Sequence, residues 1–271
     1  METGPDIRQA DGLAAAANGE PPLISFRGVG LSYLLWRSWR KRKRHWALRD
    51  VSFDLYRGET LGVVGRNGSG KSSLLRLLAG IVDPDEGSIH NAGASVSLLS
   101  LKLGFLGYLS GRENAVLSAM FLGMTRREIE SRMQQIIEYA ELGDFFDAPV
   151  NTYSSGMKAR LAFAVAFQVN PDVLLIDEVA GVGDVRFKTR SFQTMEERVR
   201  SEHNTVVFVS HSHGQIRAFC NRTLWLDQGR VMMIGNTKDV LHAYSLNLFG
   251  KDRAEATAEA EAVDSSTGNT P

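Results

Sequence analysis

The sequence has very little cysteine: Cys220 is its only one among 271 residues. A single cysteine cannot form a disulfide within the chain, and it cannot build a cysteine-based metal site. Both of these ways of stabilising a fold are therefore excluded. A chain of this kind fits a reducing, cytosolic compartment.

Long apolar runs are also missing. The longest, residues 161–167, is far shorter than the ~20 residues that a membrane-spanning helix needs. The first twenty residues lack the basic region and the apolar stretch of a secretory signal. We therefore expect any role at a membrane to depend on a partner protein.

An excess of charge of either sign is absent, since 31 Lys and Arg residues balance 31 Asp and Glu residues. This balance gives no indication of a nucleic-acid partner. The local exception is WRSWRKRKRHW, residues 36–46, which holds six cations and three Trp. It is either a solvated loop or hairpin tip, or a contact with anionic lipid headgroups or with the cytosolic face of a membrane protein. The sequence leaves both interpretations open.

The composition, 43% hydrophobic and 23% charged, is that of a globular chain with a sizeable core. Residues 1–20 and 248–271 are expected to be disordered tails around a domain at 21–247. Within it, short β-branched runs alternate with longer helical patterns, which predicts an α/β fold with a mostly parallel sheet. Strands are expected at 24–26, 51–55, 60–65, 95–99, 173–177, 205–210 and 223–227, and helices at 70–79, 111–123, 126–141, 155–168, 186–202 and 212–220. The crowding of helices between about 100 and 168 suggests a helical insert.

The segment TLGVVGRNGSGKSSLLRLL predicts a phosphate-binding loop, because Gly65-x-x-x-x-Gly70-Lys71-Ser72 stands between a strand pattern and a helix pattern. Glycines let successive backbone N–H groups point inward, and the helix offers its positive end to the same anion. Lys71 is expected to reach the β- and γ-phosphates of a nucleotide, and the Ser72 hydroxyl to bind Mg²⁺. The residues expected around the nucleotide here are Gly65, Arg66, Asn67, Gly68, Ser69, Gly70, Lys71, Ser72 and Ser73.

Two further strands end in residues suited to phosphate chemistry. PDVLLIDEVA ends in Asp177, expected to hold Mg²⁺ through water, and Glu178, expected to polarise a water molecule for attack on the γ-phosphate. NTVVFVSHS places His211 directly after a strand and Ser210. A histidine at a strand end is often structural, yet parallel strands of one sheet end at the same edge, where ligands bind, so a histidine here can lie near the γ-phosphate. We favour His211 over His213 because His211 directly follows the strand and Ser210.

The strings GRNGSGKSS, YSSGM, LLIDE and VSHS, in this order and over about residues 23–247, resemble the ATP-binding cassette of ABC transporters. The resemblance implies ATP and Mg²⁺ as cofactors, an antiparallel β subdomain and a helical subdomain at about 100–168. That family usually writes the element before the helix as LSGGQ. Here residues 153–157 read YSSGM and depart from it at three of five positions.

These departures, with LSGREN (109–114) and DEVAGVGDVRF, resemble the ATPases that export bacterial cell-surface polysaccharides such as O-antigen, capsule, teichoic acid and galactan. This subfamily resemblance implies a homodimer of ATPase subunits that works with two copies of a membrane permease. It also implies a lipid-linked glycan as cargo and a location at the cytoplasmic face of the plasma membrane.

The family's cassettes pair head to tail. The resemblance therefore implies that Ser154, Ser155 and Gly156 bind the γ-phosphate held by the phosphate loop of the partner chain. We interpret their turn as half of an ATP site and not as a cap of its own helix. By the same resemblance, Asp184 matches the loop that couples the two sites. Tyr33 matches the aromatic residue that stacks on adenine, with Trp36 and Trp46 as rivals.

One residue expected from the family is missing. No Gln lies between Ile81 and Met120, where most cassettes carry a Gln that reaches Mg²⁺ and senses the membrane partner. The stretch SLLSLKLGFLGYLSGREN, residues 97–114, occupies the place of this Gln. Ser100 or a neighbour is expected to substitute for it, and the same stretch is expected to dock the membrane subunit. Alternatives within the ABC family are export of a lipid or drug, or a soluble ATPase without a transport role. A P-loop kinase or GTPase would leave YSSGM and VSHS unexplained, and no N-K-x-D guanine-reading string is present.

Overall fold

A computed structural model describes residues 21–38, 41–99, 104–177, 185–200 and 204–248. The predicted tails lie outside this range, except for residue 248, which ends the last described helix. The strands are β1 (Ile24–Ser38), β2 (Lys41–Leu55), β3 (Thr60–Val64), β4 (Glu86–Asn91), β5 (Val96–Leu99), β6 (Val173–Asp177), β7 (Thr205–Val209), β8 (Arg222–Asp227) and β9 (Arg230–Asn236). The helices are α1 (Lys71–Leu78), α2 (Gly111–Phe121), α3 (Arg126–Ala140), α4 (Ser155–Ala166), α5 (Val185–Arg200), α6 (His213–Phe219), the short η2 (Gly143–Asp147) and η3 (Val150–Thr152), and a helix at 237–248.

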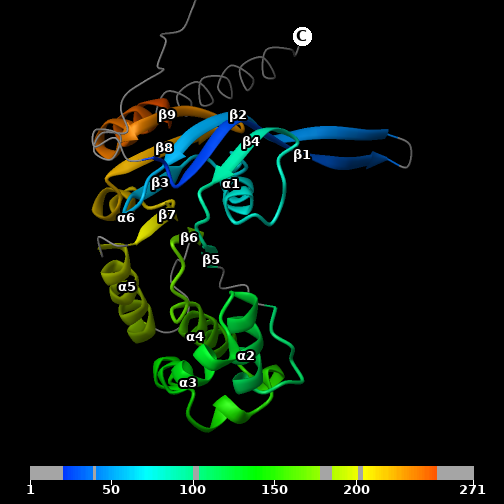
Figure 1. The fold of residues 1–271 in the computed structure, drawn as a ribbon, viewed down its shortest axis with the longest axis vertical. Coiled ribbons are helices and arrows are strands. Elements are labelled where there is room, and N and C mark those ends of the chain that lie inside the picture. The colour runs from blue at the N-terminus through cyan, green and yellow to red at the C-terminus, as the bar shows by residue number, and fades with distance from the viewer. Residues whose placement is uncertain (1–20, 39–40, 100–103, 178–184, 201–203, 249–271) are drawn as a thin grey trace, which may run out of the picture.

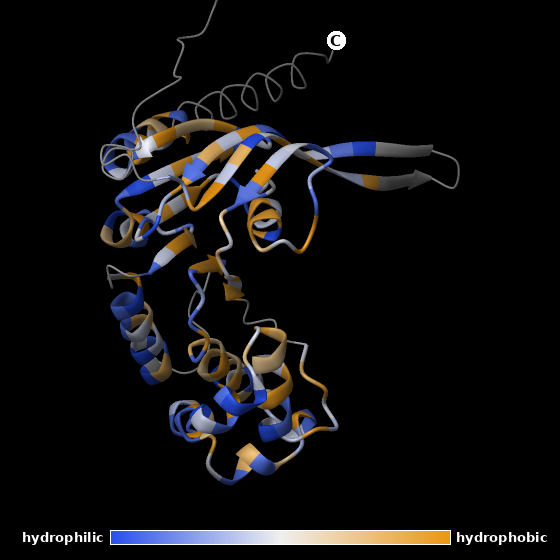
Figure 2. Cartoon of the chain, in the orientation of Figure 1, coloured by the Kyte–Doolittle hydropathy of each residue, from blue (hydrophilic) through white to orange (hydrophobic). Residues whose placement is uncertain are grey.

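The core is a six-stranded sheet in the order β5-β6-β7-β3-β8-β9. Its first five strands run parallel to one another, and β9 pairs with β8 antiparallel. All residues of β3 and β7 are buried, as expected for parallel strands that are covered on both faces. Figure 2 shows β6 in hydrophobic colours and α5, at the surface beside it, largely in hydrophilic ones. The predicted α/β fold with a mostly parallel sheet is confirmed.

Alternate residues of the core strands face two separate hydrophobic clusters. Leu175 and Val207 pack in a cluster with α1 and the antiparallel sheet. Ile176 and Phe208, next in sequence, pack in another with α5, α6 and the helix at 237–248. Successive side chains of a strand point to opposite faces, so both faces of the sheet are covered.

The second sheet is antiparallel, in the order β2-β1-β4. β1 and β2 form one hairpin whose pairing runs from Ile24 with Leu55 to Ser38 with Lys41. Figure 1 shows this hairpin projecting from the body of the molecule. Residues 36–38 and 41–46 are the outer, paired parts of this hairpin, which is compatible with both interpretations of the basic segment, and the short strands predicted at 24–26 and 51–55 are only its inner ends.

Helices α2, α3 and α4 lie together below the core sheet in Figure 1 and share a third hydrophobic cluster. Ser110 and Thr125 begin α2 and α3 with capping boxes, in which each side chain accepts from the backbone three residues on and Glu113 or Glu128 bonds back. These boxes satisfy N–H groups that a helix start leaves without partners. The domain limits 21–247 and about 100–168 stay predictions.

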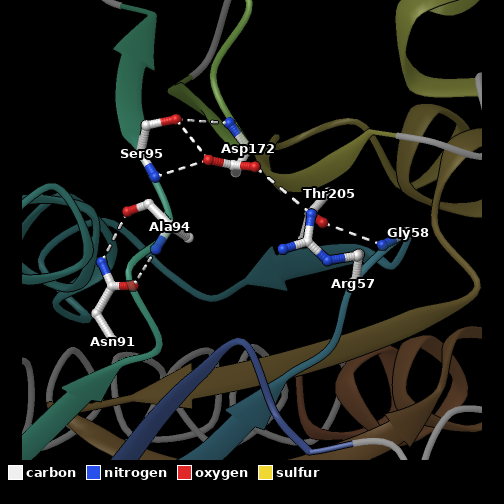
Figure 3. Close-up of polar contacts among 7 residues, drawn as sticks. All are labelled: Arg57, Gly58, Asn91, Ala94, Ser95, Asp172 and Thr205. Carbon is white, nitrogen blue, oxygen red and sulfur yellow. Dashed lines mark hydrogen bonds and ion pairs between the residues drawn. The ribbon is translucent and has the colours of Figure 1, made fainter.

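The amino ends of the core strands are tied together by polar contacts (Figure 3). Asp172 Oδ2 accepts from the backbone N of Ser95 at 2.9 Å and from Ser95 Oγ at 2.7 Å, and Asp172 N donates back to Ser95 Oγ at 3.0 Å. Arg57 Nη1 lies 3.5 Å from Asp172 Oδ1. Gly58 N donates to Thr205 Oγ1 at 3.0 Å. These contacts fix the starts of β5, β6 and β7 at the edge opposite the phosphate loop.

Candidate nucleotide site

The phosphate loop, residues 65–70, follows β3 and leads into α1, whose N-cap is Gly70. Gly70 has a φ of 108°, a conformation that side chains with a β-carbon rarely adopt. A β-carbon there would also lie 2.6 Å from the carbonyl oxygen of Ala47, and one at Gly65 would lie 2.2 Å from that of Leu226. Glycine is therefore required at both ends of the loop.

The loop encloses groups suited to an anion. Lys71 is buried, and its Nζ donates to the carbonyl oxygens of Gly65 at 2.7 Å and Arg66 at 3.0 Å. The Ser69 hydroxyl is buried and makes no hydrogen bond within the described part of the chain. A buried hydroxyl normally has a partner, so both side chains fit a loop that receives phosphate oxygens.

The predicted metal ligands, Ser72 and Asp177, come together. Asp177 ends β6 and pairs with Val209 of β7, which pairs in turn with Val63 just before the phosphate loop. Ser72 Oγ donates to Asp177 Oδ2 at 3.4 Å. Mg²⁺ keeps several waters and is usually bound through one or two protein oxygens. The contact therefore fits the expected arrangement, in which the Ser72 hydroxyl would bind Mg²⁺ directly and Asp177 would hold it through water.

Tyr33 reaches the same site from β1, since its hydroxyl lies 3.3 Å from Ser73 Oγ on α1. Its rival Trp46 has the guanidinium carbons of Arg44 and Arg49 at 4.9 and 5.8 Å from its ring centroid. The side chain of Trp36 lies outside the described part. The structure thus brings Tyr33 to the phosphate loop, while adenine stacking stays a prediction.

The two histidines after β7 have different surroundings. His213 packs edge-on against Tyr244, with ring centroids 5.5 Å apart. Ser210 is buried, donates to Gln215 Oε1 at 2.7 Å and accepts from the backbone N of Ser212 at 3.0 Å, which fixes the turn. His211 is exposed at the edge where β3 and β6 also end. The choice of His211 fits this placement, and its role stays a prediction.

The signature turn, residues 153–157, corrects one interpretation. α4 begins at Ser155, as predicted, but Ser154 is its N-cap and accepts from the backbone N of Met157 at 3.2 Å. The view that this turn does not cap its own helix is therefore wrong, because a serine before an apolar helix satisfies its free N–H groups whatever else it binds. Ser154 and Ser155 are exposed, and Gly156 is half-buried.

Sequence reasoning missed the role of Tyr153, which replaces the Leu of the family's usual pattern. Tyr153 is buried, and its hydroxyl donates to the carbonyl oxygen of Phe145 at 2.5 Å. Burial raises the pKa of this phenol. A β-carbon at Gly111 would lie 2.1 Å from the phenol oxygen. In the sequence, only the presence of YSSGM together with LSGREN pointed to this contact. Tyr153 lies in the first string and Gly111 in the second.

Several predicted residues cannot be placed. Glu178, Asp184 and Ser100 lie outside the described residues. Within the loop, Arg66, Asn67 and Gly68 are exposed. The structure therefore unites the predicted loop with Ser72, Ser73, Asp177 and Tyr33, and it leaves the base and the coupling residue as predictions.

Comparison with known proteins identifies related chains. The family model described as ABC transporter matches residues 48–181. The chain is 41% identical over 246 residues to the ABC transporter protein AbcA of Aeromonas salmonicida, covering 86% of this chain and 80% of AbcA. It is 40% identical over 230 residues to the O-antigen export system ATP-binding protein RfbB of Klebsiella pneumoniae, covering 83% and 93%. With the teichoic acids export ATP-binding protein TagH of Listeria innocua it shares 41% over 205 residues, covering 76% and 61%.

Solved structures show the same fold. The ATP-binding cassette MJ0796, a post-hydrolysis dimer bound to ADP and Pi, matches with a TM-score of 0.65 at 23% identity, covering 79% of this chain and 98% of that one. An ATP-binding subunit of an ABC transporter matches with a TM-score of 0.66 at 22% identity, covering 83% and 94%. No helix in the described ranges is both long and apolar enough to cross a bilayer. The resemblance drawn from the motifs is confirmed, and the chain belongs to the ATP-binding proteins of the ABC transporter family.

Proposed function

We propose that this chain is the ATP-hydrolysing subunit of an ABC transporter that exports a lipid-linked cell-surface polysaccharide across the cytoplasmic membrane. The observation that carries the ATPase part is the 3.4 Å contact of Ser72 with Asp177 beside the loop that encloses Lys71. The cargo part is supported by the similarity to relatives named for O-antigen and teichoic acid export.

ATP binding follows from groups that the loop already holds in place. On phosphate binding, Lys71 exchanges the carbonyls of Gly65 and Arg66 for β- and γ-phosphate oxygens. The backbone N–H groups at the start of α1 stabilise the same charge. Ser72 would hold Mg²⁺ directly and Asp177 would hold it through water, and the ion would supply positive charge to neutralise the charge that develops on the transferred phosphoryl group.

Hydrolysis is assigned to residues at the carboxyl ends of two neighbouring strands. Glu178 follows Asp177 directly and orients and deprotonates the attacking water. His211 follows β7, whose Val209 pairs with Asp177, and contacts the γ-phosphate. Parallel strands deliver such residues to one edge of a sheet.

Each ATP site is completed by a second copy of the chain. The exposed Ser154 and Ser155 stand at the start of α4, where the positive end of the helix favours an anion. In Figure 1, α4 lies in the helical part, well away from the phosphate loop between β3 and α1. A head-to-tail homodimer would bring each signature turn to the partner's phosphate loop, and Asp184 would couple the two sites.

Two copies of a membrane permease are the further partners, and they would hold the dimer at the cytoplasmic face of the membrane. The expected docking segment before α2 exposes two apolar side chains, Leu106 at 41% and Tyr108 at 74%. No nucleic-acid partner is proposed.

Complementation tests the cargo. A strain that lacks this chain should lose its surface polysaccharide and accumulate the lipid-linked polymer inside the cell. The wild-type chain should restore export, whereas a Lys71→Ala variant expressed at the same level should not. Surface polysaccharide that persists in the deletion strain would contradict polysaccharide export as the function.

A further inference from the structure

The turn between β8 and β9 has an unusual backbone. Asp227 pairs with Arg230 across a two-residue loop of Gln228 and Gly229. Both loop residues have positive φ, 48° for Gln228 and 76° for Gly229. Two positive φ angles are the mark of the tight hairpin turns that match the twist of antiparallel strands, and glycine is the residue that adopts them at least cost. The turn is therefore a tight hairpin turn in which Gly229 adopts a conformation that favours glycine.

This turn contacts the phosphate loop directly. The backbone N of Gly229 donates to the carbonyl oxygen of Ser69 at 3.0 Å. The carbonyl oxygen of Gly229 accepts from the backbone N of Arg49, on β2, at 2.8 Å. The turn thus bridges the phosphate loop and the antiparallel sheet through main-chain atoms alone.

The β8–β9 turn, β2 and the phosphate loop also pack so closely that β-carbons at two of their glycines would clash with the β2 backbone. A β-carbon at Gly229 would lie 2.6 Å from the carbonyl oxygen of Ala47 and 3.2 Å from Leu48 Cα. A β-carbon at Gly70 would lie 2.6 Å from the same oxygen of Ala47. The β2 backbone therefore fits between two glycines, one in the turn and one in the phosphate loop. Backbone atoms cannot move aside as the end of a flexible side chain can.

Contact with the Ser69 carbonyl has a consequence for the next amide. In a trans peptide the C=O and the following N–H point in opposite directions. Because Gly229 holds the Ser69 oxygen toward the β8–β9 turn, the N–H of Gly70 is directed to the opposite side of the loop. That amide precedes Lys71 and belongs to the group of N–H donors on which anion binding by such loops depends.

We propose that Gly229 is a positioning residue of the nucleotide site: with β2 as support, it fixes the Ser69–Gly70 peptide so that the Gly70 N–H can donate to a phosphate oxygen. Gly229 itself does not contact the nucleotide. This inference rests on the proposed function only in that the loop binds ATP.

A pair of glycine variants tests the inference. Gly229→Ala adds a β-carbon against Ala47, whereas Gly93→Ala, the control, places one at a similar φ of 89° with nothing within 4 Å. Both variants carry the cost of positive φ, and Gly229→Ala adds the clash with the Ala47 backbone, so both should lower the urea midpoint and Gly229→Ala should lower it more. In titrations with a fluorescent ATP analogue and Mg²⁺, Gly229→Ala should bind at least tenfold more weakly than wild type. Gly93→Ala should stay within twofold.

Equal affinities of Gly229→Ala and wild type, or an equal loss in both variants, would overturn the proposal. Hydrogen exchange on the wild-type chain covers the case in which Gly229→Ala does not fold. Exchange of the Gly229 amide should slow when MgATP is added, because the nucleotide holds the Ser69 carbonyl in place. An unchanged rate would also overturn the proposal. Failure of ATP binding, the part of the proposed function on which this inference rests, would look different, since the wild-type chain would then bind no nucleotide.

Discussion

The phenol oxygen of Tyr153 occupies space that a side chain at Gly111 would need, 2.1 Å from where its β-carbon would lie. The same oxygen donates to the carbonyl of Phe145. Tyr153 opens the signature turn and Gly111 opens α2, so the start of one helix fixes the position of the other. The unusual spelling of both strings thus has a packing reason as well as a family resemblance.

A double-mutant cycle tests this coupling. Gly111→Ala should lower the free energy of unfolding by about 1–3 kcal/mol, because the methyl group is forced against the phenol. Tyr153→Phe should cost about 1 kcal/mol through the lost hydrogen bond. The double variant should lose less than the sum, since Phe at 153 removes the phenol oxygen, the nearest atom that Ala at 111 meets, although the carbonyl oxygen of Phe146 at 2.8 Å remains. The measurement is urea unfolding of all four proteins; strict additivity would contradict the coupling.

The parts of the fold around the nucleotide could be predicted because the sequence carries their signals locally. β3, β6 and β7 are short apolar runs, and the glycines of the phosphate loop stand at fixed offsets. β4, EGSIHN, and β9, RVMMIGN, were not predicted. β4 has one half-buried apolar residue, Ile89, and no buried residue, and it is a strand only because its backbone pairs with β1. Apolar periodicity cannot show a strand that is held by pairing.

The site shows the same limit. Ser72 could be assigned because it completes the motif of the phosphate loop, and Asp177 because it ends a recognisable strand. The bond from Gly229 to Ser69 joins residues 160 positions apart through main-chain atoms, which no side-chain pattern records. Ser154 shows a different failure. A serine just before an apolar helix fits both an N-cap and a phosphate ligand, and our interpretation excluded the N-cap although one serine can serve in both roles.

Glu178→Gln should separate binding from hydrolysis. Loss of the carboxylate that deprotonates water should lower the ATP turnover rate by about 10² or more. Binding of a fluorescent ATP analogue should stay close to wild type, because Lys71 and the loop are unchanged. Lys71→Ala is the matched contrast, since it should weaken binding itself. Undiminished turnover in Glu178→Gln would remove Glu178 from the role of base.

Asp172 should make stability depend on pH. Hydrogen bonds from the Ser95 hydroxyl and backbone N lower the pKa of this carboxyl. A lowered folded-state pKa means that the stabilisation is complete above the unfolded pKa of about 4 and is lost as pH falls through the folded value. Asp172→Asn should therefore reduce the free energy of unfolding at pH 7, by about 1 kcal/mol or less because the carboxylate is partly exposed.

Urea unfolding at several pH values checks this dependence. The difference between wild type and Asp172→Asn should shrink as the pH is lowered from 7 toward 3. Asp144→Asn, which removes an exposed carboxylate from η2, is the control for the change in net charge. A difference between wild type and Asp172→Asn that stays constant over this range would contradict a role for the ionised carboxylate.

Mixed dimers decide whether Ser154 acts on the partner's ATP. If the signature turn acts in trans, Lys71→Ala in one chain and Ser154→Ala in the other damage the same composite site and leave the second site intact. Both substitutions in one chain should instead damage both sites, and the ATPase rate should be lower by about tenfold or more. Because Ser154→Ala also removes an N-cap, at about 1 kcal/mol, Thr125→Ala at the N-cap of α3 is the control. It should give the same rate in both arrangements, and a higher rate with Lys71→Ala and Ser154→Ala in one chain would show action in cis.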